Sequence, residues 1–202
     1  MRGEKYSLAL EVEMNEYSSW MRLLNGLDDA LPGGSARRPV LMLALGAFAL
    51  GTDAFVISGV LPRIASDLGV TLPQAGLLIT VFSGVYAFAA PVMAVVTGTT
   101  SRRGLLMASL ACFTAANVLA AVAPSFAVMV VARAAAALVA GLHMAAASAT
   151  AATVAPISER GRALAAVLSG LTVATALGVP LGTLIGQALN WRYTFLFVAA
   201  LS

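Results

Sequence analysis

The sequence predicts an all-α transmembrane bundle of six helices, the sixth of them truncated. Of its 202 residues, 60% are hydrophobic and only 10% are charged, and the mean hydropathy is +0.91. Average soluble domains are about 45–50% apolar and carry about 25% charged residues. After residue 38, long apolar runs alternate with short polar segments. Composition and pattern together exclude a water-soluble globular domain and a disordered chain as the main interpretation.

Residues 1–38 form a separate segment of mixed charge. Six of the nine acidic residues lie within the first 29 positions, and the segment closes with the run Leu31-Pro-Gly-Gly-Ser. Because acidic residues interrupt it, it lacks the continuous apolar stretch of a secretory signal peptide. We expect a cytoplasmic segment and assign it no function. A start codon placed upstream of the native one is the alternative explanation.

The apolar runs from residue 39 onward give the order of the helices. We expect spans at about residues 39–61, 73–96, 105–123, 126–154, 163–189 and 193–202. The first five reach the roughly 20 residues that cross a 30 Å hydrocarbon core, whereas the sixth has ten and stops with the chain. No run shows the alternation of barrel strands, so helices are expected. Pro62 follows the first run, and we expect the first helix to end there.

The arginines in the loops predict the orientation of the bundle. Six lie on one side of the membrane: Arg37, Arg38, Arg102, Arg103, Arg160 and Arg162. Two lie on the other side: Arg63 and Arg192. Because cytoplasmic loops are enriched in basic residues, the N-terminal segment and the second and fourth loops are expected in the cytoplasm. The same bias explains the net charge of +3 without a nucleic-acid partner.

Two charged residues, Asp53 and Arg133, fall inside the apolar runs. Asp53 lies eight residues before Leu61, about 12 Å from the outer end of its helix, and Arg133 lies seven residues past Phe126, about 10 Å from its outer end. Opposite charges at equal depth predict an ion pair or a shared watery cavity. Either the pair only locks two helices, or Asp53 is a proton site whose charge Arg133 biases. Arginine does not itself release a proton at accessible pH.

The fifth run carries a doubled small-residue motif around a proline. Gly178, Gly182 and Gly186 are spaced four residues apart, and Pro180 lies among them. Glycines at this spacing share one helix face and permit close helix packing, while proline kinks a helix. We expect either a packing face or a bend at a moving interface.

Hydroxyl side chains within the spans are candidates to line a cavity. They are Thr52, Ser58, Thr80, Ser83, Tyr86, Thr172 and Thr175. His143 and Asn117 are expected to serve packing. The sequence contains no catalytic motif of a known hydrolase, protease or phosphate-binding enzyme, and its one cysteine and one histidine predict no metal site. We therefore expect neither an enzyme nor a bound cofactor.

Taken together, these motifs resemble the N-terminal half of a major facilitator superfamily transporter over about residues 39–202. The similarity is to the drug:proton antiporter branch of chloramphenicol-resistance and arabinose-efflux permeases. Three segments carry it: Gly51-Thr-Asp-Ala-Phe-Val-Ile-Ser-Gly-Val-Leu-Pro62, Ala176-Leu-Gly-Val-Pro-Leu-Gly182 and Trp191-Arg-Tyr-Thr-Phe195. The resemblance implies alternating access between two six-helix halves in the bacterial inner membrane. It also implies proton-coupled efflux of small amphipathic, drug- or sugar-like compounds.

The resemblance assigns the membrane acid to Asp53, the fourth-helix arginine to Arg133 and the hinge to the glycines and proline of the fifth helix. One departure concerns the loop before Arg102 and Arg103, which has no acidic residue where the family usually has an aspartate. These two arginines then serve topology alone. With its C-terminal half missing, the chain is not expected to transport by itself. The alternatives are a non-transporting membrane module and a homodimeric half-transporter.

Overall fold

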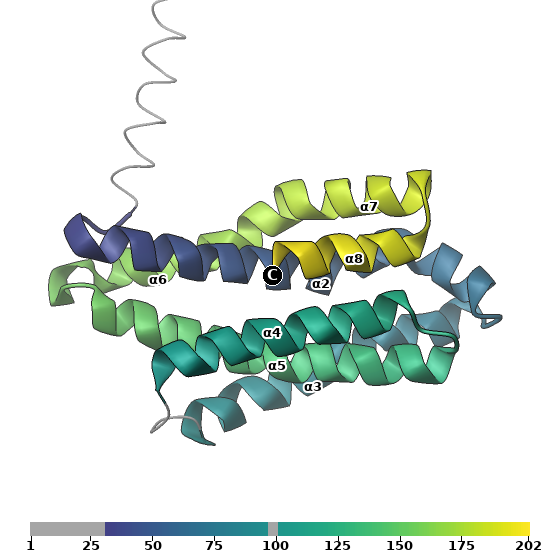
Figure 1. The fold of residues 1–202 in the computed structure, drawn as a ribbon, viewed down its shortest axis with the longest axis horizontal. Coiled ribbons are helices and arrows are strands. Elements are labelled where there is room, and N and C mark those ends of the chain that lie inside the picture. The colour runs from purple at the N-terminus through teal and green to yellow at the C-terminus, as the bar shows by residue number, and fades with distance from the viewer. Residues whose placement is uncertain (1–30, 97–100) are drawn as a thin grey trace, which may run out of the picture.

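The computed structural model describes residues 31–96 and 101–202, and these fold into helices joined by short turns (Figure 1). The elements of these ranges are η1 (Gly34–Ala36), α2 (Arg37–Asp67), α3 (Leu72–Val96), α4 (Arg102–Ala121), α5 (Phe126–Val154), η2 (Ile157–Glu159), α6 (Arg160–Val173), η3 (Ala174–Gly178), α7 (Val179–Ala188) and α8 (Trp191–Leu201). No strand occurs in them. Residues 1–30 of the predicted N-terminal segment lie outside the described residues.

The helices lie side by side in an elongated bundle (Figure 1). Both α3 and α4 pack along α5, α2 packs along α6 and α7, and α8 lies against α4 and α7. Within the described ranges, five helical stretches are long and apolar enough to cross a membrane, and α8, with 11 residues, is shorter. The all-α transmembrane fold predicted from the sequence is therefore confirmed.

Apolar side chains occupy both the inside and the outside of the bundle. The interior is rich in small residues, and α5 alone buries Ala136, Ala137, Ala140 and Ala147. Large apolar side chains such as Phe88, Val95 and Met107 point outward and are more than half exposed. Small residues inside permit close helix packing, and a large apolar outer surface suits solvation by lipid tails.

The first helix does not end at Pro62, contrary to the sequence prediction. α2 continues through the proline to Asp67. Pro62 itself is exposed, while Ile64 and Ala65 on the following turn are buried. A proline in a helix interior costs about 3 kcal/mol locally, and burying these two apolar side chains offsets that cost.

Successive loops alternate between the two ends of the bundle. At one end, the amide of Gly33, which precedes α2, donates a hydrogen bond to the Glu159 carboxylate between α5 and α6 (2.9 Å). At the other end, Asp67 of α2 meets Arg192 of α8 (3.0 Å). The arginines at positions 37, 38, 102, 103, 160 and 162 therefore share one end, and Arg63 and Arg192 share the other.

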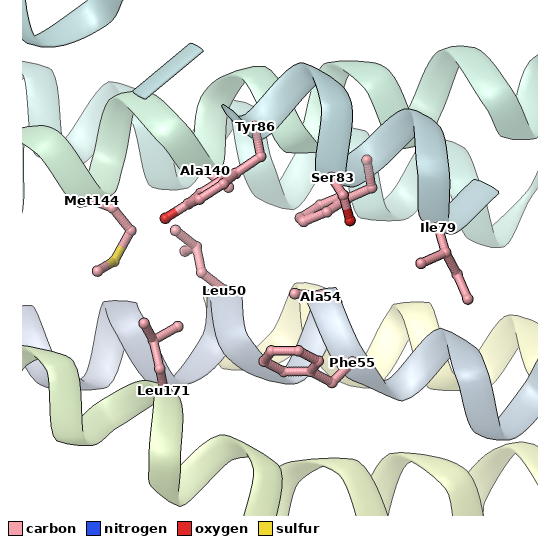
Figure 2. A pocket seen from close by; sticks show the side chains of 10 residues that line it. Leu50, Ala54, Phe55, Ile79, Ser83, Tyr86, Ala140, Met144 and Leu171 are labelled. Atoms are coloured by element: carbon pink, nitrogen blue, oxygen red, sulfur yellow. The ribbon is translucent and has the colours of Figure 1, made fainter. Parts of the chain in front are cut away.

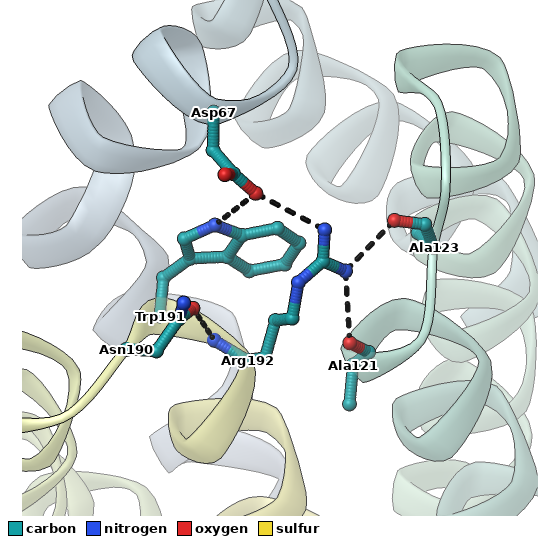
Figure 3. Close-up of polar contacts among 6 residues, drawn as sticks. All are labelled: Asp67, Ala121, Ala123, Asn190, Trp191 and Arg192. Carbon is teal, nitrogen blue, oxygen red and sulfur yellow. Dashed lines mark hydrogen bonds and ion pairs between the residues drawn. The ribbon is translucent and has the colours of Figure 1, made fainter.

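Arg192 joins three helices at its end of the bundle (Figure 3). Its guanidinium donates to the carbonyls of Ala121 (3.1 Å) and Ala123 (2.8 Å) and to the Asp67 carboxylate (3.0 Å). The same carboxylate accepts a hydrogen bond from the indole of Trp191 (3.1 Å). Carbonyls at a helix C-terminus have no partner inside the helix, so Arg192 satisfies the end of α4 and fixes the start of α8.

We expect Arg192→Gln to destabilise the fold by about 1–3 kcal/mol, because it leaves the carbonyls of Ala121 and Ala123 without their arginine donor and removes one of the two donors to Asp67. Thermal unfolding of the purified protein in detergent measures the effect. Arg38→Gln is the matched control, since Arg38 is exposed at the opposite end. Equal stability of the two variants contradicts the role given to Arg192.

Candidate functional site

Asp53 of α2 and Arg133 of α5 form an ion pair in the bundle interior. Arg133 Nη1 donates to Asp53 Oδ1 at 2.8 Å, and Arg133 Nη2 lies 3.5 Å from the backbone oxygen of Asp53. The two side chains are 0% and 1% exposed, respectively. The structure thus brings together the two intramembrane charges that the sequence places at equal depth.

The ion pair leaves two polar atoms without a protein partner. Asp53 Oδ2 and Arg133 Nε are both buried, and neither has a hydrogen-bond partner among the described residues. The guanidinium instead lies against aromatic rings, 4.2 Å from the ring centre of Phe82 and 6.0 Å from that of Phe195. A cation over an aromatic face is attracted by the ring quadrupole, and more strongly so away from water. Aromatic rings therefore complete the surroundings of Arg133, and Asp53 Oδ2 is left without a hydrogen-bond partner among the described residues.

A cavity of about 310 Å³ opens beside this pair, between α2, α3, α5 and α6 (Figure 2). Its walls are apolar except for two hydroxyl-bearing side chains, and none of the lining side chains is charged. The lining residues are Leu50, Ala54, Phe55, Ile79, Phe82, Ser83, Tyr86, Ala140, Met144 and Leu171. Small-molecule sites typically combine apolar walls with a few polar groups that orient the ligand. The cavity therefore has the composition of a site for a small amphipathic molecule.

Ser83 and Tyr86 are the predicted cavity residues that line this space. The other five do not line it: Thr52, Ser58, Thr80, Thr172 and Thr175. Of these, Thr52, Ser58, Thr80 and Thr175 donate their hydroxyls to carbonyls of their own helical run. Such local bonds satisfy Ser and Thr without a ligand. At position 172 the side chain is exposed, and the preceding residue, Leu171, faces the cavity instead.

The cavity residues that sequence reasoning missed are apolar. Phe82 is the most consequential, since it lines the cavity and also contacts Arg133. Its position has a sequence signal: Ile79, Phe82, Ser83 and Tyr86 follow the spacing of a single helix face. The hydroxyls of Ser83 and Tyr86 therefore mark the face on which Phe82 also lies.

His143 is buried near the middle of α5, and its packing role stays a prediction. Its Nδ1 lies 2.8 Å from the Ser109 hydroxyl of α4, and its Nε2 has no partner among the described residues. A Cβ placed on Gly46 of α2 meets this Nε2 at 2.5 Å. The imidazole therefore occupies space that a glycine leaves. Asn117 is also buried and donates to the Phe113 carbonyl of its own helix (3.1 Å).

The glycines of the predicted hinge pack against α2. They belong to a seam of small residues at every fourth position, which consists of Gly170, Ala174, Gly178, Gly182 and Gly186. A Cβ on Gly182 meets Val56 at 2.5 Å, and one on Gly178 meets Thr52. Thr194 of α8 donates to the Gly182 carbonyl from the adjoining side (2.9 Å). The small residues therefore allow the backbone of the α6–α7 run to pack closely against α2.

Pro180 changes the helix geometry just before it. Residues Ala174–Gly178 form a π-helix, and Pro180 lies in the first turn of α7. A proline lacks the amide hydrogen and crowds the carbonyl four residues earlier, and a wider turn relieves both problems. The run Arg160–Ala188 therefore stays helical throughout, with a π-helical segment rather than a break.

A family model described as the Major Facilitator Superfamily matches residues 43–202. The chain belongs to the major facilitator superfamily. It is 44% identical over 161 residues to a chloramphenicol resistance protein of Streptomyces lividans, covering 80% of this chain and 41% of that protein. The inner membrane transport protein YdhP of Escherichia coli K12 is 37% identical over 163 residues, 81% of this chain and 42% of that protein. A probable sugar efflux transporter of Pasteurella multocida is 33% identical over 163 residues, 81% and 40% of the two chains.

This major facilitator chain therefore spans about two fifths of the length of the curated relatives it matches. Its ion pair and its cavity both lie within the matched region. Within the described residues, no three His, Cys, Asp or Glu side chains gather in a group that could hold a metal ion.

We expect Asp53→Asn and Arg133→Gln each to lower the free energy of unfolding by about 3–5 kcal/mol, because each leaves a buried partner uncompensated. The double variant is expected to recover most of that loss, since it buries no net charge. Thermal unfolding in detergent of the four proteins of this cycle measures the coupling between the two residues. If the loss of unfolding free energy in the double variant equals the sum of the losses in the two single variants, the pairing is contradicted.

We expect Gly182→Ala to destabilise the protein by about 1–3 kcal/mol, because its Cβ overlaps Val56. Gly76→Ala is the matched control: Gly76 lies in a helix with no atom within 4 Å of its Cβ position, and alanine there improves helix propensity. Chemical denaturation of both variants measures the difference. If Gly182→Ala is as stable as the wild-type protein or more stable, the close packing of α7 on α2 is contradicted.

Proposed function

We propose that this chain is one half of a proton-coupled efflux transporter for small amphipathic compounds, drug-like or sugar-like, that works by alternating access. The observation that carries the proposal is the buried pair of Asp53 and Arg133 beside an uncharged cavity. Membership of a transporter superfamily and efflux-related names among its relatives support the direction of transport.

Asp53 has the chemistry of the proton-carrying group. A carboxylate takes up and releases protons, whereas arginine stays charged at accessible pH. Protonation of Asp53 changes the net charge of the pair from zero to plus one in the bundle interior. An unpaired buried cation is unfavourable, so the proton shifts the equilibrium towards an arrangement in which water or another group reaches Arg133. Proton binding thereby drives a conformational change.

The second wall of the transport path comes from a further six-helix half. Substrate sites of transporters built from repeats lie near the midplane between the repeats. The cavity of this half is lined from α2, α3, α5 and α6, and we propose that it faces that second half. The end that carries six arginines lies on the cytoplasmic side of the bacterial inner membrane, in keeping with the positive-inside bias.

The seam between α2 and the α6–α7 run has a supporting role in this scheme. Because Gly178 and Gly182 bring α7 against the helix that carries Asp53, a shift of α2 moves α7 with it. The π-helical turn before Pro180 gives the run a place at which to bend. We propose that these residues transmit movement at the ion pair along the half.

We expect Asp53→Asn to abolish proton-driven efflux by the complete gene product, because an amide carries no exchangeable carboxyl proton. Uptake of labelled chloramphenicol into inverted membrane vesicles, energised by an imposed proton gradient, measures the effect. Asp67→Asn is the matched control, since Asp67 lies on the same helix but is 44% exposed in an outer contact. It is expected to retain more than half of the wild-type rate.

Full proton-driven uptake by Asp53→Asn contradicts the role of Asp53 as the coupling acid. Absence of uptake by the wild-type product contradicts transport of this probe and favours a non-transporting membrane module. Uptake by residues 1–202 expressed alone contradicts the need for a second half and favours a homodimeric transporter.

A further inference from the structure

Phe82 lies at the boundary between the cavity and the ion pair. It belongs to the cavity wall, and its ring centre is 4.2 Å from the guanidinium carbon of Arg133. The side chain is 6% exposed, so one small part of the ring reaches the cavity while the rest is enclosed. Arg133 itself is not part of the cavity wall. A molecule in the cavity therefore contacts the Phe82 ring, which in turn contacts the Arg133 guanidinium.

A second ring extends this arrangement into the cavity. Tyr86, one turn along α3, is stacked nearly parallel to Phe82, with ring centres 6.3 Å apart and planes 7° apart. Its hydroxyl-bearing ring points into the cavity (Figure 2). The guanidinium, Phe82 and Tyr86 thus form a row that leads from the ion pair to the place an occupant would take.

We propose that Phe82 is the positioning residue that couples occupancy of the cavity to the charge state of the Asp53–Arg133 pair. This inference rests on the proposed function and adds the route by which substrate acts on the proton site. An occupant that stacks against Phe82 and Tyr86 moves the Phe82 ring away from Arg133. The substrate class is therefore an uncharged molecule with an aromatic or otherwise flat apolar face, which suits walls without charged side chains.

The direction of the coupling follows from electrostatics. Before substrate binds, Asp53 carries a proton, and the quadrupole of the Phe82 ring is the interaction that stabilises the Arg133 guanidinium. When the ring moves away, Arg133 depends more strongly on the carboxylate, which favours its ionised form. The proton then leaves Oδ2, the oxygen without a hydrogen-bond partner in the described structure, and passes to water. Substrate binding thereby releases a proton, as exchange of one for the other requires.

Other titratable side chains on the surrounding helices do not provide this link. Tyr86 is the titratable residue that α3 presents in the cavity wall, and it is stacked on Phe82 rather than bonded to the pair. From α5, His143 is bound to Ser109 of α4. From α8, the contact with Arg133 is the uncharged ring of Phe195. Phe82 is therefore the link that the described contacts provide between cavity and pair.

Proton release on substrate binding tests this assignment. The complete gene product is purified in detergent in weakly buffered solution, chloramphenicol is added as the probe, and protons released are measured per probe molecule bound. We expect Phe82→Leu to lower this ratio at least fivefold, because the pair already lacks its ring before the probe arrives. Phe82→Tyr keeps the ring and is expected to restore more than half of the wild-type ratio.

Phe55→Leu is the matched control. Phe55 lines the same cavity from α2, and its ring has no contact with Arg133 in the described structure. This variant is expected to weaken probe binding while each bound molecule still releases the wild-type number of protons. A Phe82→Leu protein that behaves in the same way overturns the assignment of Phe82. Phe82→Met is the second ring-free variant and replaces Phe82→Leu if that protein does not insert.

The failures of the two proposals are distinguishable. If the wild-type protein binds the probe without releasing protons, or if Asp53→Asn releases as many protons as wild type, the proposed coupling at Asp53 is wrong. If wild type releases protons in an Asp53-dependent manner and Phe82→Leu does so equally well, only the role of Phe82 is wrong.

Discussion

The ion pair between Asp53 and Arg133 is the interaction on which the rest of this structure depends. A single charged side chain at the centre of a membrane helix costs about 2.5–3.5 kcal/mol on insertion. Here each charge lies in the bundle interior, 2.8 Å from its partner, and aromatic rings cover the guanidinium. The pair joins α2 to α5, the helix along which α3 and α4 pack, so one electrostatic contact ties both sides of the bundle.

α2 links the remaining features because it takes part in each of them. It carries Asp53, forms one wall of the cavity, and packs through Thr52 against Gly178 of η3 and through Val56 against Gly182 of α7. A change in charge at Asp53 therefore acts on a helix whose neighbours are in backbone-close contact and have little freedom to absorb movement. Rigid packing around Asp53 is what the proposed transport cycle, with its two conformational states, requires.

The helices and the ion pair could be predicted from the sequence, because long apolar runs and two isolated charges are rare and specific signals. The cavity could not, since lipid-facing and cavity-facing side chains such as Phe88 and Phe82 are equally apolar. Hydroxyl groups were a weak guide because residues such as Thr52 and Ser58 bond to their own helix. The sequence does not predict the end of α2 correctly, because burial of Ile64, a tertiary effect, outweighs the local effect of Pro62.

The most direct measurement of the central claim is infrared difference spectroscopy of the complete protein in lipid, recorded between neutral and acidic pH. We expect the carboxylic-acid carbonyl band that appears on acidification to include a component in wild type and in Asp67→Asn that is missing in Asp53→Asn, beyond the contribution that the other carboxyl groups make in all three proteins. A band of equal intensity in Asp53→Asn, or none in wild type over the range in which the protein stays folded, would show that the buried aspartate does not exchange a proton.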